Sequence, residues 1–326
     1  MRIGPHPIEG RLLLAPMAGI TDRPFRTLCR GFGAALAVSE MSSGDEQLRD
    51  TLKSKTRLDH AGEPGPVSVQ LVGDEPGELA EAARRLEGSG VDIVDLNMGC
   101  PAKKVCRRDA GSSLLRDELL VARILERVVA SVAIPVTLKI RTGYARTYRN
   151  GVAVARIAEQ AGIAALAVHG RTREDLFAGQ AEYDTIAAIR AAVRLPVIAN
   201  GDIADADKAR DVLARTGADA VMIGRGAQGR PWIFREIESA WQGHAWHCDA
   251  ALRRDTVLAH LDGLYGLYGE AHGVRIARKH LRWYGAGLPG FATFWAHACR
   301  LEAAAAQRAA AGGFFAPGQD TLAQAA

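Results

Sequence analysis

One stretch of the sequence combines residue types that can do chemistry. An apolar run that ends at residue 96 gives way to Asn97, and Cys100, Pro101, Lys103 and Lys104 follow closely. Because Pro101 cannot donate to a strand ladder and disfavours helix at the residue before it, we expect Cys100 on an extended strand exit. Neighbouring cations favour a nucleophilic thiolate, whereas a thiol with a pKa near about 8.5 can donate a proton at neutral pH. The simpler interpretation is that Cys100 only packs in the core as a small hydrophobic residue.

Polar residues and glycines also stand at or near the ends of other apolar runs. They are Gln70, Lys139, Arg141, His169, Arg171, Asn200, Gly201, Asp202, Gly224 and Arg225, with the segment 15–19 after the first run. Alone, Lys139 could be a solvated charge, His169 a structural histidine and residues 200–202 a turn. Barrel enzymes, however, have their active sites at the carboxyl-terminal strand ends. The set as a whole therefore predicts one site.

The last two of these strand ends have the composition of an anion site. Backbone N–H groups can approach a ligand closely at the glycines at positions 201, 224, 226 and 229, and Arg225 and Arg230 add positive charge. Phosphate sites after the seventh and eighth strands recur in (β/α)8 barrels. We expect a phosphorylated ligand here, with Lys139 stabilising negative charge on a cofactor ring, which is how proteins usually tune a flavin.

A later part of the chain is strongly basic. Residues 271–300 contain five Arg or Lys residues and no acidic residue, and Arg275, Arg278 and Lys279 share one helical face. A second basic cluster, residues 103–108, lies beside the cysteine at position 100. Either cluster alone could be a solvated surface, but two are typical of a protein that binds a polyanion such as RNA.

Short apolar runs that alternate with helical patterns must position these residues. The runs are residues 12–15, 35–38, 67–72, 92–97, 136–140, 165–169, 197–200 and 220–224, and helical spacing covers 78–87, 119–130, 152–160, 183–192 and 205–215. Such alternation predicts βα units around a parallel sheet. Eight strands favour an α/β protein with a (β/α)8 TIM barrel. The alternative, a doubly wound open sheet, normally has a GxGxxG turn after an early strand, and none stands there.

The pattern changes after about residue 240. We expect a catalytic barrel over residues 1–242 and a C-terminal helical domain over residues 243–326, with helical spacing at 250–285 and 291–311. The tail after residue 317 is expected to be frayed.

Composition excludes several classes of protein. Hydrophobic content of 48% and charged content of 24% are those of an ordinary soluble protein, and a net charge of +4 permits a nucleic-acid partner without requiring one. The five scattered cysteines form no CxxC pair, so we expect no metal site and no disulfide framework. The N-terminus has no apolar signal region and no apolar run is long enough to span a membrane, so we expect a cytoplasmic protein.

Several ordered motifs resemble those of the tRNA-dihydrouridine synthase family. They are residues 15–22, 97–104, 169–172, 198–203 and 222–225, and the segments 228–234 and 275–280 favour its bacterial B subgroup. The resemblance covers the chain to about residue 283 and weakens after it. It implies a TIM-barrel enzyme that binds FMN, takes electrons from NADPH and reduces the C5–C6 double bond of uridine in the tRNA D-loop, at position 17 in this subgroup.

The resemblance also implies roles for residues. FMN would be bound by Pro16, Met17, Ala18, Gln70, Lys139, Asn200, Gly201, Asp202, Gly224 and Arg225, with His169 close by. Hydride would pass from flavin N5 to C6 of the uracil, and Cys100 would act as an acid that protonates C5. The uridine would leave its stack. As hypotheses, a monomer contacts tRNA through Asn97, Lys103, Lys104, Arg141, Arg171, Arg275, Arg278 and Lys279.

Two alternatives stay open. An FMN barrel oxidoreductase acting on a free pyrimidine, as in dihydroorotate dehydrogenases, explains the strand ends but not the basic helical domain. A non-catalytic RNA-binding protein on a barrel scaffold explains the charge but not Cys100 beside phosphate loops.

Overall fold

The predicted barrel is present and closed. In the computed structural model, which describes residues 1–45 and 51–317, nine short parallel strands follow one another in the order β4-β3-β11-β10-β9-β8-β7-β6-β5. Val38, next to β4, forms a parallel bridge with Ser68 of β6, so the sheet returns on itself. β4 and β5 are therefore two pieces of one barrel strand, and the fold is the expected eight-stranded (β/α)8 barrel.

The strands match the apolar runs closely. They are β3 (Leu12–Leu14), β4 (Leu36–Ala37), β5 (Ser42–Ser43), β6 (Ser68–Val72), β7 (Ile93–Met98), β8 (Val136–Arg141), β9 (Ala165–His169), β10 (Val197–Asn200) and β11 (Ala220–Ile223). An antiparallel hairpin, β1 (Arg2–Ile3) and β2 (His6–Pro7), precedes them. The piece β5 was not predicted, because two serines carry no apolar signal.

Helices connect the strands, and most of them cover the outside of the barrel. They are α1 (Arg23–Gly31), α2 (Leu52–Leu58), α3 (Pro76–Gly88), α4 (Lys103–Cys106), α5 (Glu118–Val129), α6 (Gly151–Gln160), α7 (Asp184–Ala192), α8 (Ala206–Thr216) and α9 (Ile233–Trp241), with 3-10 turns η2 (Gly111–Arg116) and η3 (Arg225–Ala227). Asp22, Asp117 and Asp205 begin α1, α5 and α8 by accepting a backbone N–H with the side chain.

Two apolar layers result from the alternation of side chains along the strands. Leu13, Ile93 and Ile198 point into the barrel, and Ile3 of the N-terminal hairpin packs with them. Their neighbours, such as Leu14, point outward to the helices. Burial on both faces explains why the strands are continuous apolar runs.

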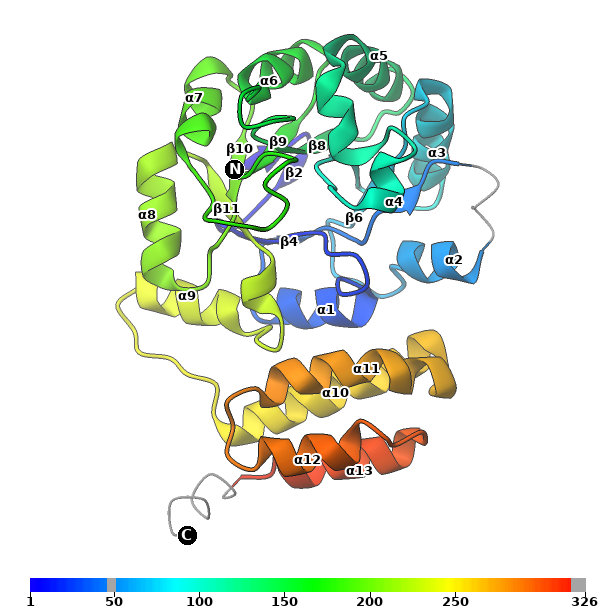
Figure 1. Cartoon of the computed structure of the whole chain (residues 1–326), viewed down its shortest axis with the longest axis vertical. Helices are drawn as coiled ribbons and strands as arrows, with labels where there is room; N and C mark the ends of the chain where they lie inside the picture. The colour runs from blue at the N-terminus through cyan, green and yellow to red at the C-terminus, as the bar shows by residue number, and fades with distance from the viewer. Residues whose placement is uncertain (46–50, 318–326) are drawn as a thin grey trace.

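The C-terminal helices form a second body, whose core also includes Phe32 and Trp232 from the barrel part of the chain. The helices are α10 (Ala250–Tyr268), α11 (Glu270–Gly285), α12 (Phe291–Ala298) and α13 (Ala304–Phe314), and Figure 1 shows them stacked against the α1 side of the barrel. The first predicted helical run is broken at Gly269, which has φ +74, and the second is broken at 299–303. The ring of Phe25 on α1 stacks on His260 of α10 at 5.5 Å.

The predicted frayed tail, residues 318–326, lies outside the described residues. Within the described part of the chain, the helices are all too short or too polar to cross a membrane.

Candidate active site

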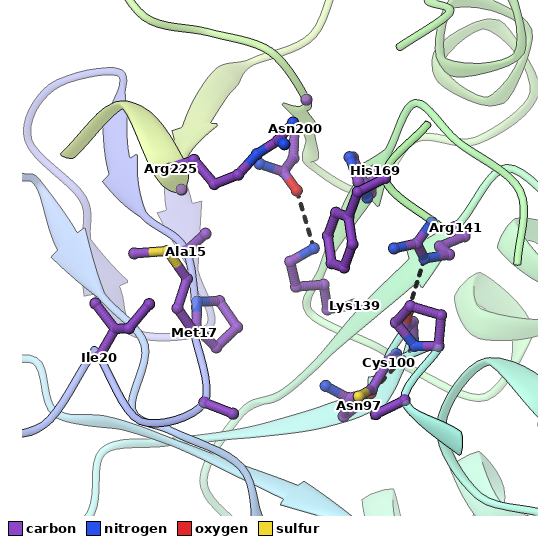
Figure 2. A pocket seen from close by; sticks show the side chains of 18 of the residues that line it. Ala15, Met17, Ile20, Asn97, Cys100, Lys139, Arg141, His169, Asn200 and Arg225 are labelled. Carbon is purple, nitrogen blue, oxygen red and sulfur yellow. Dashed lines mark hydrogen bonds between the residues drawn. The ribbon is translucent and has the colours of Figure 1, made fainter. Parts of the chain in front are cut away.

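A cavity of about 1160 Å³ opens at the carboxyl-terminal ends of the barrel strands. Its wall includes every residue predicted to bind the cofactor: Pro16, Met17, Ala18, Gln70, Lys139, His169, Asn200, Gly201, Asp202, Gly224 and Arg225. Three of the predicted tRNA contacts also line it: Asn97, Lys103 and Arg141. In Figure 2, Lys139 lies between the side chain of Met17 and that of Cys100. Barrel closure has thus brought the separate strand ends to one place.

Lys139 of β8 is a buried cation in the middle of the cavity wall. Its Nζ donates to Oδ1 of Asn200 at 3.0 Å, and Nδ2 of Asn200 donates to the carbonyl of Met222 at 2.7 Å, which fixes the amide orientation. Burial, together with the charge of Arg141, lowers the pKa of Lys139 to about 8. A desolvated ammonium group held by a neutral amide is suited to stabilise negative charge on a bound ring.

Cys100 follows β7 and is held at both ends of its peptide unit. Oδ1 of Asn97 accepts the N–H of Cys100 at 2.9 Å and that of Gly99 at 3.2 Å. The carbonyl of Cys100 accepts from the backbone N–H and the hydroxyl of Ser112, both at 3.0 Å. Burial raises the pKa of the Cys100 thiol, although Arg141 and Lys139 oppose this. The thiol therefore stays protonated at neutral pH and is suited to donate a proton.

A chain of buried side chains below the cavity fixes Asn97 itself. Nδ2 of Asn97 donates to Oε1 of Gln70 at 2.8 Å, and Nε2 of Gln70 donates to Oδ2 of Asp95 at 2.7 Å. Thr137 donates to the other Asp95 oxygen at 2.5 Å. These contacts follow from the parallel register, which pairs Gln70 with Asp95 and Asp95 with Thr137. Because the carboxylate only accepts, each amide along the chain has one orientation.

Arg171 is enclosed by the protein. Its side chain is 2% exposed, and it donates to both Asp202 oxygens at 2.9 and 2.7 Å and to the carbonyls of Ala178 and Gly179. The hypothesis that Arg171 contacts tRNA therefore has no support in its position. It instead supports the loop that carries Asp202.

His169 is neutral in this arrangement. Burial lowers the pKa of His169 well below its usual range, and the nearby cations, Lys139 foremost, lower it further. Nε2 of His169 lies 3.3 Å from Nη1 of Arg171, and because a guanidinium group can only donate, Nε2 accepts and the ring proton is on Nδ1.

The turn after β10 fits the expected phosphate end. Gly201 has φ +130, and a Cβ there would lie 2.7 Å from that of Ala181. The Arg225 side chain, 56% exposed, pairs with Asp202 at 2.9 Å across the same edge. Gly229, which we expected in the anion site, lies elsewhere. A Cβ at that residue would lie 2.4 Å from the backbone of Trp283, so this glycine allows the barrel to approach α11.

The predicted basic face of α11 is divided between different surroundings. Arg275 is exposed, Arg278 donates to the carbonyl of Leu301 at 3.0 Å, and Lys279 donates to the carbonyl of Gly19 on the barrel. The three residues thus lie on one face of the helix, but Arg275 is exposed to solvent whereas the other two are half-buried. On the barrel, Lys103 and Lys104 of α4 are both exposed near the cavity.

Sequence reasoning missed several cavity residues. Leu176 and Phe177 line the mouth with side chains 52% and 57% exposed, and the Phe177 ring lies 5.3 Å from the guanidinium carbon of Arg141. They stand in an irregular loop without periodicity, so no pattern marked them. Asp95 was also missed, although a polar residue two positions before Asn97 shares its strand face. Among the residues the structure describes, none of the His, Cys, Asp and Glu side chains form a group of three or more that could hold a metal ion.

Comparisons with known proteins show the family of this chain. The family model described as dihydrouridine synthase matches residues 13–312. The chain is 57% identical to tRNA-dihydrouridine synthase B of Pseudomonas aeruginosa, over 98% of this chain and 97% of that protein. It is 56% identical to tRNA-dihydrouridine synthase B of Xanthomonas axonopodis, over 97% and 96%.

Solved structures share the fold at low sequence identity. Histamine dehydrogenase from Rhizobium sp. 4-9 has a TM-score of 0.54 at 14% identity, over 80% of this chain and 50% of that one. The old yellow enzyme homologue from Zymomonas mobilis has a TM-score of 0.53 at 15% identity, over 76% and 92%. These likenesses support the barrel architecture alone.

Proposed function

This chain belongs to the dihydrouridine synthase family, and we propose that it is the enzyme that reduces the C5–C6 double bond of a uridine in tRNA. It is an oxidoreductase on a TIM-barrel fold. We propose a D-loop uridine, at position 17, as the target, with FMN as cofactor and NADPH as reductant. The observation that carries the proposal is that Cys100 lines the same cavity as Lys139, whose Nζ is held by the neutral amide of Asn200.

The residues of the cavity fit a flavin mononucleotide. Pro16, Met17 and Ala18 give an apolar wall for a ring, and Lys139 gives a cation without a carboxylate hydrogen-bonded to its Nζ among the described residues. The turn at Gly201 and the exposed side chain of Arg225 suit a phosphate. When bound, the reduced flavin would supply the hydride that goes to C6 of the uracil.

Cys100 supplies the proton in this proposal. Hydride addition at C6 leaves negative charge on the C5 side of the uracil, and the Sγ–H of Cys100 donates its proton to C5. Two features support this role. Burial keeps the thiol protonated, and Asn97 and Ser112 fix the backbone on both sides of the side chain.

The substrate side of the cavity is cationic. We propose that Lys103, Lys104 and Arg275 contact tRNA phosphates, because these side chains are exposed. Asn97 and Arg141 line the cavity and are assigned to the flipped uridine. The helical body, residues 243–326, is assigned to tRNA binding, and the protein to action as a monomer in the cytoplasm, where tRNA is found.

The test is the variant Cys100→Ala. It should bind FMN and tRNA as the unchanged protein does and form little dihydrouridine, measured by mass spectrometry of D-loop fragments from unmodified tRNA. Cys299→Ala, a half-exposed cysteine on the C-terminal helices, is the matched control and should be fully active. Near-normal product from Cys100→Ala would refute the acid role.

The same assay tests the alternative of an oxidoreductase that acts on a free pyrimidine. With free uridine or orotate in place of tRNA, the proposed enzyme should form no reduced pyrimidine. Reduction of a free pyrimidine at a comparable rate would favour the free-pyrimidine oxidoreductase.

A further inference from the structure

The loop between β3 and α1, residues 15–22, has an inner side that lines the cavity and an outer side, at Gly19, that contacts α11. Met17, Ala18 and Ile20 line the cavity on the inner side. The loop is tied across itself, because the N–H of Met17 donates to the Thr21 hydroxyl at 2.9 Å and the N–H groups of Ile20 and Thr21 donate to the carbonyl of Met17 at 3.0 Å. A displacement of the outer side therefore moves Met17.

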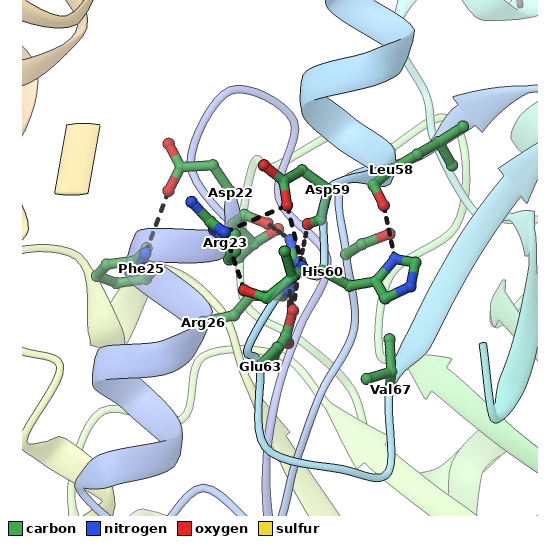
Figure 3. Close-up of polar contacts among 12 residues, drawn as sticks. Asp22, Arg23, Phe25, Arg26, Leu58, Asp59, His60, Glu63 and Val67 are labelled. Carbon is green, nitrogen blue, oxygen red and sulfur yellow. Dashed lines mark hydrogen bonds and ion pairs between the residues drawn. The ribbon is translucent and has the colours of Figure 1, made fainter. Parts of the chain in front are cut away.

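The barrel holds the end of this loop through a buried ion pair. Arg26 and Glu63, with side chains 1% and 2% exposed, pair at 2.5 Å, and Nη1 of Arg26 donates to the carbonyl of Thr21 at 2.8 Å. Figure 3 shows this cluster beside the N-cap contact from Phe25 to Asp22. The end of the loop is thus fixed within the barrel.

The middle of the loop is held differently. Gly19, at φ +75, donates its N–H to Oε2 of Glu40 at 2.5 Å and accepts at its carbonyl from Nζ of Lys279 on α11. Glu40 is buried and lies 3.4 Å from Nε of Arg57. The Gly19 carbonyl is thus contacted by a side chain of the C-terminal helices, whereas the Gly19 N–H is contacted by a side chain of the barrel. Tyr268 of α10 adds a second contact, from its hydroxyl to Oδ2 of Asp22 at 3.2 Å.

We propose that Lys279 is a positioning residue for the cofactor site and not a tRNA contact, so that docking of the C-terminal helices on the barrel sets cofactor affinity. This inference rests on the proposed function. Three observations carry it: Lys279 donates to a backbone carbonyl of the cavity loop, it is less exposed than Arg275 one turn earlier, and the buried carboxylate of Glu40 accepts the N–H of the same glycine. The inference replaces the expectation that Lys279 binds RNA.

The experiment compares Lys279→Met with Arg275→Met, which changes the exposed residue on the same helix. Binding of FMN to the apoprotein is followed by flavin fluorescence, and tRNA binding to the flavin-loaded protein is followed across a salt series. Lys279→Met should bind FMN about tenfold more weakly, the lower end of the effect of losing one charge-assisted hydrogen bond, with unchanged tRNA affinity. Lys279→Arg should restore FMN affinity.

Arg275→Met should show the reverse pattern. FMN affinity should be unchanged, and the salt dependence of tRNA binding should fall by about one unit of slope, as expected for one lost phosphate contact. If Lys279→Met instead behaves like Arg275→Met, the lysine is an RNA contact and the inference is wrong.

A second measurement does not depend on the cofactor. Amide hydrogen exchange in peptides that cover residues 15–22 should be faster in Lys279→Met than in the unchanged protein and unaltered in Arg275→Met. Equal exchange in all three proteins would refute the positioning role. If the unchanged protein binds no FMN, the proposed function fails, while the exchange result still decides whether Lys279 holds the loop.

Discussion

Replacing Asp22 with asparagine should stabilise the protein above neutral pH and do much less in acid. Asp22 caps α1, accepting the Phe25 N–H at 3.1 Å, and its second oxygen accepts the Tyr268 hydroxyl at 3.2 Å. Asparagine caps a helix as well as aspartate does, and its Nδ2 can donate to the tyrosine oxygen. The substitution thus keeps the shape and both contacts and removes the charge.

The magnitude follows from the environment of Asp22. Burial, with a contribution from Glu40, raises the pKa of Asp22 from 3.8 to about 7. A group whose pKa is raised on folding contributes stability below its unfolded pKa and loses it as pH rises through the folded pKa. The full loss for this shift is about 4 kcal/mol, and about 3 kcal/mol of it falls between pH 5 and 8.5.

The assay is urea unfolding of the unchanged protein and Asp22→Asn at pH 5 and pH 8.5. The advantage of the variant in unfolding free energy should grow by about 3 kcal/mol between the two pH values. Asp205→Asn, at the exposed N-cap of α8, is the matched control and should give the same difference at both. An Asp22→Asn advantage that does not change with pH would refute the argument that burial opposes ionisation of this carboxyl.

Three further predictions concern the cavity. Iodoacetamide at pH 7.5 should alkylate Cys106 before Cys100, as measured by peptide mass spectrometry. Burial raises the pKa of Cys100, whereas at Cys106 the contacts with serine hydroxyls and Arg173 outweigh burial and lower the pKa. The opposite order of alkylation would contradict the argument that the Cys100 thiol is protonated. Gln70→Leu leaves two buried polar partners unpaired and should cost about 2–5 kcal/mol in urea unfolding, and a loss below about 1 kcal/mol would show that the amide chain does not stabilise the site. Arg171→Met should cost about 1–3 kcal/mol, because it removes the hydrogen bonds that a buried guanidinium group donates, while Asp202 keeps its pair with Arg225. The folded variant should bind tRNA as the unchanged protein does; weakened tRNA binding at unchanged stability would instead support a contact between Arg171 and tRNA.

Much of the fold could be read from the sequence because the barrel strands are buried on both faces. The apolar runs predicted the positions of the strands, and the polar residues near the end of each run predicted the carboxyl-terminal edge of the barrel. Lys139, His169 and Asn200 are far apart in sequence, yet each stands in the carboxyl-terminal half of its strand. Parallel closure alone then brings them to one cavity. The two-piece second strand was less visible, since β5 consists of serines.

The roles of the basic residues could not be predicted in the same way. Helical periodicity shows that Arg275, Arg278 and Lys279 share a face, but exposure depends on what packs against that face. Leu301 comes from a later segment and Gly19 from the first barrel loop. Arg171 is a similar case, because its carboxylate partner belongs to another strand end. Charge counted along a sequence does not distinguish a cation facing solvent from one that closes a tertiary contact.

The contacts of Lys279 and Tyr268 with the first barrel loop limit how this enzyme can be recombined. A chimera that exchanges the C-terminal helices between relatives at the linker before α10 would also exchange the donors for Gly19 and Asp22. Such a chimera would keep its cofactor affinity only if the loop of residues 15–22 were exchanged together with the helices that donate to it. The barrel and the C-terminal helices are therefore separate along the chain, but an engineered exchange must treat them as one unit where they meet at residues 15–22.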